Sequence, residues 1–195
     1  PKQLTNIYCD LGNIDNSIDI IFKKVIGFNI PLYGFVNNAA IAYDDIISNL
    51  QYEPLLKMYQ INVFSPMMIT KYVIRNMLLH RTSGSIVHIS SISVHTGYKG
   101  LAMYASTKGA LEAFSKTTAR EWGEKGIRSN ALVAGFMETS MSSTLSKEQR
   151  DRIYKRTSLK IPTTVESVAN MVEFLLSDNS RSVTGANVFV DSGTI

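Results

Sequence analysis

Tyr104 and Lys108 form a pair of side chains that could transfer a proton. They stand four residues apart within the segment 103–111. On a helix, residues at this spacing lie one above the other on a single face. A lysine cation beside a phenol favours the phenolate, so Lys108 is expected to lower the pKa of Tyr104 from about 10 towards neutral pH. The pair could then donate and accept a proton, although the same spacing also arises on solvated helix faces.

Polar side chains stand at the ends of two apolar runs upstream of this pair. The run 84–91 has the composition of a strand and ends on Ser91, and the run 33–40 reaches Asn37 and Asn38. Open α/β sheets place their chemistry at the carboxyl ends of parallel strands. Asn62 follows in an amphipathic helical pattern. Taken singly, each residue also has an ordinary structural explanation, because Ser and Asn end strands, bend helices and fill turns.

In this order and spacing, these residues resemble the short-chain dehydrogenase/reductase family, in particular its 3-oxoacyl-acyl-carrier-protein reductase-like members. The family's Tyr-x-x-x-Lys matches Tyr104 and Lys108, and its serine, thirteen residues before the tyrosine, matches Ser91. Its helix asparagine matches Asn62. Its strand-end Asn-Asn-Ala-Gly matches 37–40, with alanine in the last place. The resemblance runs from about residue 5 to the C-terminus.

The resemblance implies an NAD(P)-dependent oxidoreductase that transfers hydride between the nicotinamide and a small-molecule carbonyl/alcohol substrate. Tyr104 would be the general acid and base, and Ser91 would hydrogen-bond the reacting oxygen. Lys108 would lower the tyrosine pKa and bind the nicotinamide ribose. Asn62 would hold a water that links Lys108 to solvent.

The resemblance also assigns cofactor and substrate contacts. The cofactor, NAD or NADP, would be bound by Asp10, Asn37, Ala39, Tyr104, Lys108, Gly135 and Thr139. Substrate contacts are expected at His95, which lies between the serine and the tyrosine, and at Met137 and Met141 in a segment that resembles the family's lid. The methionines suit an adaptable apolar pocket and ordinary packing equally well. The residue that would distinguish NAD from NADP precedes the matched region, so that choice stays open.

The order of apolar segments predicts an α/β fold. Strands and helices alternate, which indicates a Rossmann-like, doubly wound parallel sheet with helices on both faces and one domain over 1–195. We expect a strand at 6–9 leading to Asp10, followed by a helix capped by Asn13 or Asp15. A long helix over 54–79 should be kinked near Asn62, because Pro66 lies within it. Further segments are expected as strands at 84–91, 128–133 and 187–190 and as helices around Tyr104, before 156 and over 165–176.

One family feature has no counterpart in the matched region. None of the twelve glycines forms a Gly-x-x-x-Gly-x-Gly turn, so we expect the N-terminal βαβ portion, which holds the cofactor pyrophosphate in the family, to be missing. Such a unit takes roughly 30 residues. Either the chain is part of a longer protein, which we favour because every catalytic position is present, or the protein is short and impaired. The second case supports an alternative function as a non-catalytic fragment, scaffold or subunit unable to bind cofactor.

Composition narrows the remaining possibilities. The net charge is +4 over 195 residues without a basic stripe, so nucleic-acid binding is not expected. No apolar run reaches the ~18 residues that span a bilayer, so no membrane partner is expected. The single cysteine, Cys9, suits a cytoplasmic protein. His80, His88 and His95 lack metal-ligand spacing, so no metal is expected. A homodimer or homotetramer is implied by the resemblance.

Overall fold

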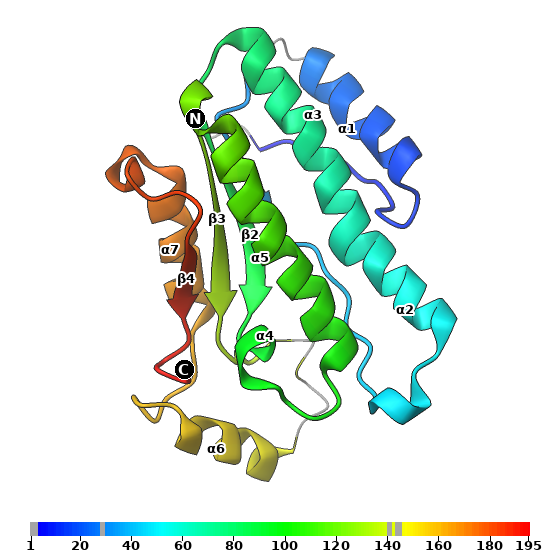
Figure 1. Ribbon diagram of the computed structural model, residues 1–195, viewed down its shortest axis with the longest axis vertical. Helices are drawn as coiled ribbons and strands as arrows, with labels where there is room; N and C mark the ends of the chain where they lie inside the picture. The colour runs from blue at the N-terminus through cyan, green and yellow to red at the C-terminus, as the bar shows by residue number, and fades with distance from the viewer. Residues whose placement is uncertain (1–3, 28–29, 140–141, 143–145) are drawn as a thin grey trace.

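A parallel sheet of four strands forms the centre of the protein. The structure is a computed structural model that describes residues 4–27, 30–139, 142 and 146–195. The strands β1 (Gly34–Asn37), β2 (Gly84–Ser91), β3 (Ile127–Ala134) and β4 (Asn187–Val190) lie side by side in that order, and every neighbouring pair is parallel. Their carboxyl ends therefore share one edge of the sheet (Figure 1). The prediction of a Rossmann-like parallel sheet is confirmed.

Helices cover both faces of this sheet (Figure 1). The helices α3 (Ser65–His80) and α5 (Ala102–Trp122) pack on one face, with α1 (Ile14–Gly27) outside α3, and α7 (Val165–Leu176) packs on the other. The side chains of β2 show the division, because Ile86 contacts the cluster of α1 and α3 whereas Val87 contacts that of α7. Successive residues of a strand point to opposite faces. Helix α6 (Lys147–Arg156) lies beyond the carboxyl ends of the strands.

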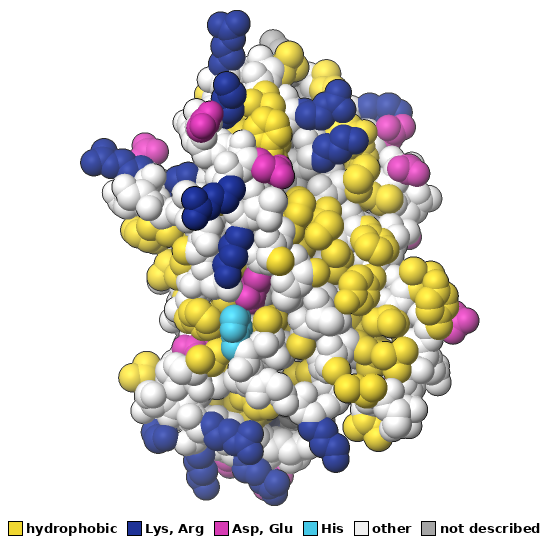
Figure 2. Space-filling view, in the orientation of Figure 1, with side chains coloured by type: hydrophobic (Ala, Val, Ile, Leu, Met, Phe, Trp, Pro, Cys, Tyr) yellow, Lys and Arg dark blue, Asp and Glu magenta, His cyan; other side chains and the backbone are white. Residues whose placement is uncertain are grey.

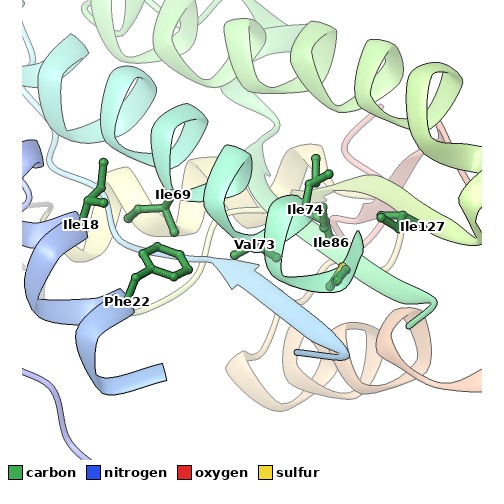
Figure 3. Close-up of a cluster of buried hydrophobic side chains, with 8 residues drawn as sticks. Ile18, Phe22, Ile69, Val73, Ile74, Ile86 and Ile127 are labelled. Carbon is green, nitrogen blue, oxygen red and sulfur yellow. The ribbon is translucent and has the colours of Figure 1, made fainter. Parts of the chain in front are cut away.

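Two apolar clusters hold the layers together. Figure 3 shows the first, in which α1 and α3 meet the sheet; it contains Ile18, Phe22, Ile69, Val73, Ile74, Met77, Ile86 and Ile127. The second lies under α7 and contains Val87, Leu132, Ala134, Val168 and Leu175. Burying one such aliphatic or aromatic side chain contributes about 1.5–3 kcal/mol. The clusters therefore fix the strands against helices on both sides and hold the carboxyl edge rigid.

The long helix predicted over 54–79 is interrupted near Asn62, as expected. Helix α2 (Tyr52–Tyr59) passes into the π-helical segment η2 (Gln60–Phe64), and α3 begins at Ser65. Pro66 lacks the N–H that would donate to the carbonyl of Asn62 in a regular α-helix. A π-turn is the usual way to accommodate such a mismatch inside a helix.

The strand predicted at 6–9 is wrong. Residues 4–10 adopt neither helix nor strand, because a strand needs a hydrogen-bonded neighbour and none of the described strands pairs with them. The helix that follows is capped by Asn13, whose Oδ1 accepts from the Asn16 N–H at 3.4 Å. The helix at 165–176 and the strand at 187–190 are confirmed. The described part of the chain contains no helix long and apolar enough to cross a membrane.

Short helical turns complete the described chain. They are η1 (Ile47–Asn49), α4 (Ser93–Thr96), η3 (Gly123–Lys125) and η5 (Asp178–Ser180). The turn α4 matters for function because it begins two residues after Ser91 and continues into the segment that leads to α5. It therefore joins the end of the second strand to the helix of Tyr104 and Lys108.

Candidate active site

Tyr104, Lys108, Asn62 and Ser91 gather at the carboxyl edge of the sheet. Lys108 Nζ lies 5.7 Å from the centroid of the Tyr104 ring and donates to the carbonyl of Ile89 at 2.8 Å. That carbonyl is two residues from Ser91 along β2. Asn62 Nδ2 donates at 3.1 Å to the hydroxyl of Thr107, the neighbour of Lys108. Residues separated by up to 46 positions are thus brought into one site.

Ser91 is held so that its own proton stays available. The backbone N–H of Ser93, at the start of α4, donates to Ser91 Oγ at 3.2 Å. A hydroxyl that accepts in this way still has one O–H to donate. The turn is fixed to the sheet because the Ile92 N–H donates to the carbonyl of Ala134 at 3.0 Å. Ser91 can therefore donate a hydrogen bond to an oxygen placed at the carboxyl edge.

The electrostatics of the pair differ from the sequence expectation. Burial, with a smaller contribution from the nearby Asp44 carboxylate, raises the pKa of Tyr104 to about 12. Burial also lowers the pKa of Lys108 to about 8. The expected lowering of the tyrosine pKa by Lys108 is therefore wrong, because desolvation of the phenolate outweighs the cation 5.7 Å from the ring. At neutral pH the site holds a protonated phenol beside a buried ammonium.

Asn62 is a link between segments rather than a free amide. Its Oδ1 accepts from the Ile41 N–H at 2.9 Å, and its Nδ2 donates to the Ile41 carbonyl at 2.8 Å as well as to Thr107. The side chain ties the segment after β1 to α5 and has no hydrogen left for a water. The backbone carbonyl of Asn62 is the group that Pro66 leaves without its α-helical donor.

The residues expected to bind the cofactor lie along the same edge of the sheet, except Asp10. Asn37 ends β1, is 6% exposed, and its Nδ2 has no hydrogen-bond partner among the described residues. An orphaned buried donor here fits a ligand rich in acceptor oxygens, such as a dinucleotide. Ala39 follows two residues later. Asp10 is exposed, and its carboxylate accepts from the Gly12 N–H at 2.9 Å. It therefore lies on the surface and not beside Tyr104 and Lys108.

Gly135 and Thr139 extend the edge beyond β3. The Gly135 N–H donates to the Val190 carbonyl at 2.8 Å, and a Cβ on Gly135 would lie 2.6 Å from the Asp191 Cα. Only glycine fits this approach of two chain segments. Thr139 is exposed, and its N–H donates to Ser142 Oγ at 3.0 Å.

Two of the residues expected to contact substrate, His95 and Met137, lie in different parts of the structure. His95 lines a cleft of about 330 Å³ together with Thr96, Tyr98, Arg156, Thr194 and Ile195. Met137 packs against the apolar cluster under α7, which is the ordinary packing that its sequence also allowed. Met141 lies outside the described residues.

A second cleft of about 310 Å³ lies between residues 45–47 and the segment 97–105, and its wall includes Ser93. Its lining is mainly apolar, with Ile46, Ile47 and Leu101 contributing side chains. The cleft is bordered by the residues that follow Ser91 and by the beginning of the Tyr104 helix.

Sequence reasoning missed two acidic residues of the site. Asp44 influences the Tyr104 pKa across 60 positions of the chain, and no local pattern indicates it. Glu112 is 5% exposed and lies on α5 one turn after Lys108. The spacing of Tyr104, Lys108 and Glu112 at i, i+4 and i+8 was the available signal, since such residues share one helix face.

The chain is similar to known proteins along most of its length. A family model described as enoyl-(acyl carrier protein) reductase matches residues 2–194. Carbonyl reductase (NADPH) 2 of Sus scrofa is 35% identical over 173 residues, which cover 88% of this chain and 71% of that protein. The 3-oxoacyl-(acyl-carrier-protein) reductase of Escherichia coli K12 is 35% identical over 177 residues, covering 91% and 72%.

Solved structures of dehydrogenases have the same fold as this chain. A gluconate 5-dehydrogenase from Burkholderia cenocepacia in complex with NADP and tartrate superposes with a TM-score of 0.91 at 25% identity, covering 96% of this chain and 74% of that one. A 4-hydroxyisoleucine dehydrogenase complexed with NADH gives a TM-score of 0.89 at 25% identity, covering 95% and 77%. Because the family model, the relatives and the fold agree over nearly all of its length, the chain belongs to the short-chain dehydrogenase/reductase family.

Proposed function

We propose that this protein is an NAD(P)-dependent oxidoreductase that interconverts a small carbonyl compound and its alcohol, with Tyr104 as the general acid and base. The observation that carries the proposal is that Lys108 lies beside the Tyr104 ring and donates to the carbonyl of Ile89, two residues before Ser91 at the carboxyl end of β2. Family membership supports the class of reaction, because the similar proteins are named as carbonyl reductases, acyl-carrier-protein reductases and dehydrogenases.

Tyr104 and Ser91 act on the reacting oxygen. The nicotinamide cofactor, when bound, supplies or accepts the hydride at the carbonyl carbon. Because its pKa is raised to about 12, Tyr104 is protonated at neutral pH and has a proton to give to the oxygen as negative charge develops there. Ser91, whose Oγ already accepts from Ser93, donates a second hydrogen bond to the same oxygen.

Lys108 and Asn62 keep the tyrosine supplied with protons. One ammonium hydrogen of Lys108 is used by Ile89, which leaves two for the cofactor ribose and for a proton path. With a pKa of about 8, the lysine gives up a proton more readily than an exposed one would. The backbone carbonyl of Asn62 would hold the water that connects Lys108 to solvent, since the Asn62 side chain is occupied.

The cofactor would lie along the carboxyl edge of the sheet. Asn37 and Ala39 would bind its adenosine side, and Gly135 and Thr139 its carboxamide side. Asp10 would contact the adenine from the surface. The Nδ2 of Asn37 supports this placement best, because it is a buried donor for which the described residues provide no acceptor.

The substrate class follows from the second cleft. Its mainly apolar lining between residues 45–47 and 97–105 favours an aliphatic carbonyl compound over a polar sugar. Relatives named as 3-oxoacyl-(acyl-carrier-protein) reductases support a 3-oxoacyl substrate. His95 would border the polar end of the site, from the neighbouring cleft.

A homodimer or homotetramer is the proposed assembly. On α2 and η2, large apolar side chains face solvent: Tyr52 is 67% exposed, Leu56 45% and Phe64 44%. Figure 2 shows apolar side chains gathered over this side of the molecule. Exposed apolar area of this kind marks contact surfaces in soluble proteins. The free Cys9 supports a reducing, cytoplasmic setting.

The proposal is tested with the purified protein by titrating NADH and NADPH and by following cofactor oxidation with a 3-oxoacyl thioester, a simple aliphatic ketone and a ketose. Saturable binding of one cofactor and turnover of the first two substrates are expected. Tyr104→Phe should keep cofactor binding and lose turnover. Absence of both binding and turnover would overturn the proposal and leave a non-catalytic member of the family.

A further inference from the structure

Glu112 is a buried acidic residue with no role in the reaction described above. It lies on α5, one turn after Lys108, and is 5% exposed. Ser90 Oγ donates to its Oε1 at 2.5 Å, and Asn187 Nδ2 donates to its Oε2 at 2.6 Å. His95 Nε2 lies 3.1 Å from each of the two carboxylate oxygens. Three side chains from three other elements therefore converge on one carboxylate.

Two of these partners flank Ser91 along the chain. Ser90 and His95 lie on either side of Ser91, at the end of β2 and within α4. Glu112 therefore holds both ends of the short turn that carries Ser91. Inside this turn the Ser93 N–H positions the Ser91 hydroxyl at 3.2 Å. Asn187 of β4 fixes the carboxylate itself from the far side.

These partners favour a carboxylate at this position. The hydroxyl of Ser90 and the amide of Asn187 donate to Glu112, the His95 ring nitrogen is able to donate to it, and a carboxylate is the side chain that offers only acceptors. Such charge-assisted hydrogen bonds are shorter and stronger than neutral ones. A glutamine of the same shape would turn an amide donor towards one of these donors.

We propose that Glu112 is a positioning residue for the reaction, which clamps the turn 90–95 and thereby holds Ser91 Oγ in place for the reacting oxygen. The inference rests on the role proposed for Ser91. It adds a residue that acts through Ser90 and His95 without touching substrate or cofactor. A displacement of about 1 Å in a group that orients a reactant can cost about 100-fold in rate.

The test compares Glu112→Gln with Ser115→Ala. Ser115 lies three residues further along α5, is 1% exposed and binds Ser129 Oγ of β3 at 2.9 Å, so its loss removes a buried helix-to-sheet hydrogen bond away from the turn. Glu112→Gln should lower kcat about 10- to 100-fold with the cofactor dissociation constant unchanged. Ser115→Ala should stay within about twofold of the wild type in kcat.

A double variant tests whether Glu112 acts on kcat through Ser90. If Glu112 acts through Ser90, then Ser90→Ala lowers kcat as well, and adding it to Glu112→Gln costs less than the product of the two single effects. Equal losses in Glu112→Gln and Ser115→Ala, or a loss of cofactor binding together with kcat, would overturn the proposal in favour of a purely structural role. An unchanged kcat in Glu112→Gln would overturn it directly.

Hydrogen exchange separates this inference from the proposed function. Glu112→Gln should speed amide exchange in residues 91–101 about tenfold or more, with little change in β3, whereas Ser115→Ala should not. If the wild type shows no turnover, the proposed function fails and the exchange result alone decides the clamp. Unchanged exchange in 91–101 would then overturn it.

Discussion

Replacing His88 by leucine should stabilise the protein, although His88 is buried in the centre of the sheet. His88 lies on β2 and is 0% exposed, and neither of its ring nitrogens has a hydrogen-bond partner among the described residues. Its ring meets Phe114 edge-on at 5.7 Å. Burial, and then the charge on Lys108, lower the pKa of His88 to about 4. The imidazole is therefore neutral, unpaired and costly to bury.

The magnitude follows from two contributions. Burying a polar group without a partner costs about 1–3 kcal/mol, which His88→Leu removes at every pH. Loss of the edge contact with Phe114 reduces this gain in the free energy of unfolding by about 0.5–1.5 kcal/mol. A gain of about 1 kcal/mol in the free energy of unfolding is expected at pH 7. Protonation of the imidazole adds a separate contribution that depends on pH.

Protonation adds to the difference in acid. The pKa of His88 is lower in the folded protein, at about 4, than its ordinary 6.5, so between these values the unfolded chain binds a proton that the folded chain does not. The free energy of unfolding of the wild type therefore falls as pH drops from about 6.5 to 4. At about 1.4 kcal/mol for each pH unit, the loss reaches about 3 kcal/mol. His88→Leu should lack this loss, so the gap between the two proteins widens to about 4 kcal/mol at pH 4.

Urea unfolding between pH 4 and 7, followed by the fluorescence of Trp122, measures both contributions. His80→Leu is the control for the same substitution elsewhere, because His80 lies at the partly exposed end of α3 and not inside the sheet. Parallel profiles for the wild type and His88→Leu would refute the acid contribution. A destabilisation of more than about 1 kcal/mol at pH 7 would show that the imidazole has a partner in solution.

Further predictions concern the site. Tyr104→Phe should lower kcat about 100- to 10,000-fold while the cofactor dissociation constant stays within a few-fold, measured by nucleotide fluorescence; a small drop would remove Tyr104 as the acid. For alcohol oxidation, which needs the phenolate, log(kcat/KM) should rise with pH through pH 7–10, because burial raises the pKa of Tyr104 to about 12; a plateau below pH 9 would contradict this. Gly135→Ala should lower stability by about 1–3 kcal/mol, seen as a fall in Tm, because a Cβ would lie 2.6 Å from the Asp191 Cα. An unchanged Tm would mean that the two segments separate freely.

The sequence determined the fold class and the order of its elements. Alternating strand and helix patterns are local, so the parallel sheet, the helix over 165–176 and the strand over 187–190 could be predicted from residues within a few positions of one another. The break near Asn62 was equally local, since Pro66 removes a hydrogen bond four residues back. The spacing of Tyr104 and Lys108 on one helix face predicted their proximity for the same reason.

The expectation for residues 6–9 failed for the opposite reason. Their apolar pattern suits a strand, but strand structure depends on a neighbouring strand, which no short stretch of sequence specifies. The same limit applied to the side chain of Asn62, which is occupied by hydrogen bonds to Ile41, a residue 21 positions away.

The protonation states and hydrogen bonds of the site depend on contacts between distant parts of the chain. The pKa of Tyr104 moved up rather than down, because burial and Asp44 outweigh the neighbouring lysine. The carboxylate of Glu112 gained its partners from β2, α4 and β4, which meet only after the chain has folded. Charge states and hydrogen-bond networks depend on desolvation and on contacts between distant segments. The types and spacing of the residues therefore indicate which groups are able to react, and packing sets their protonation states and orientations.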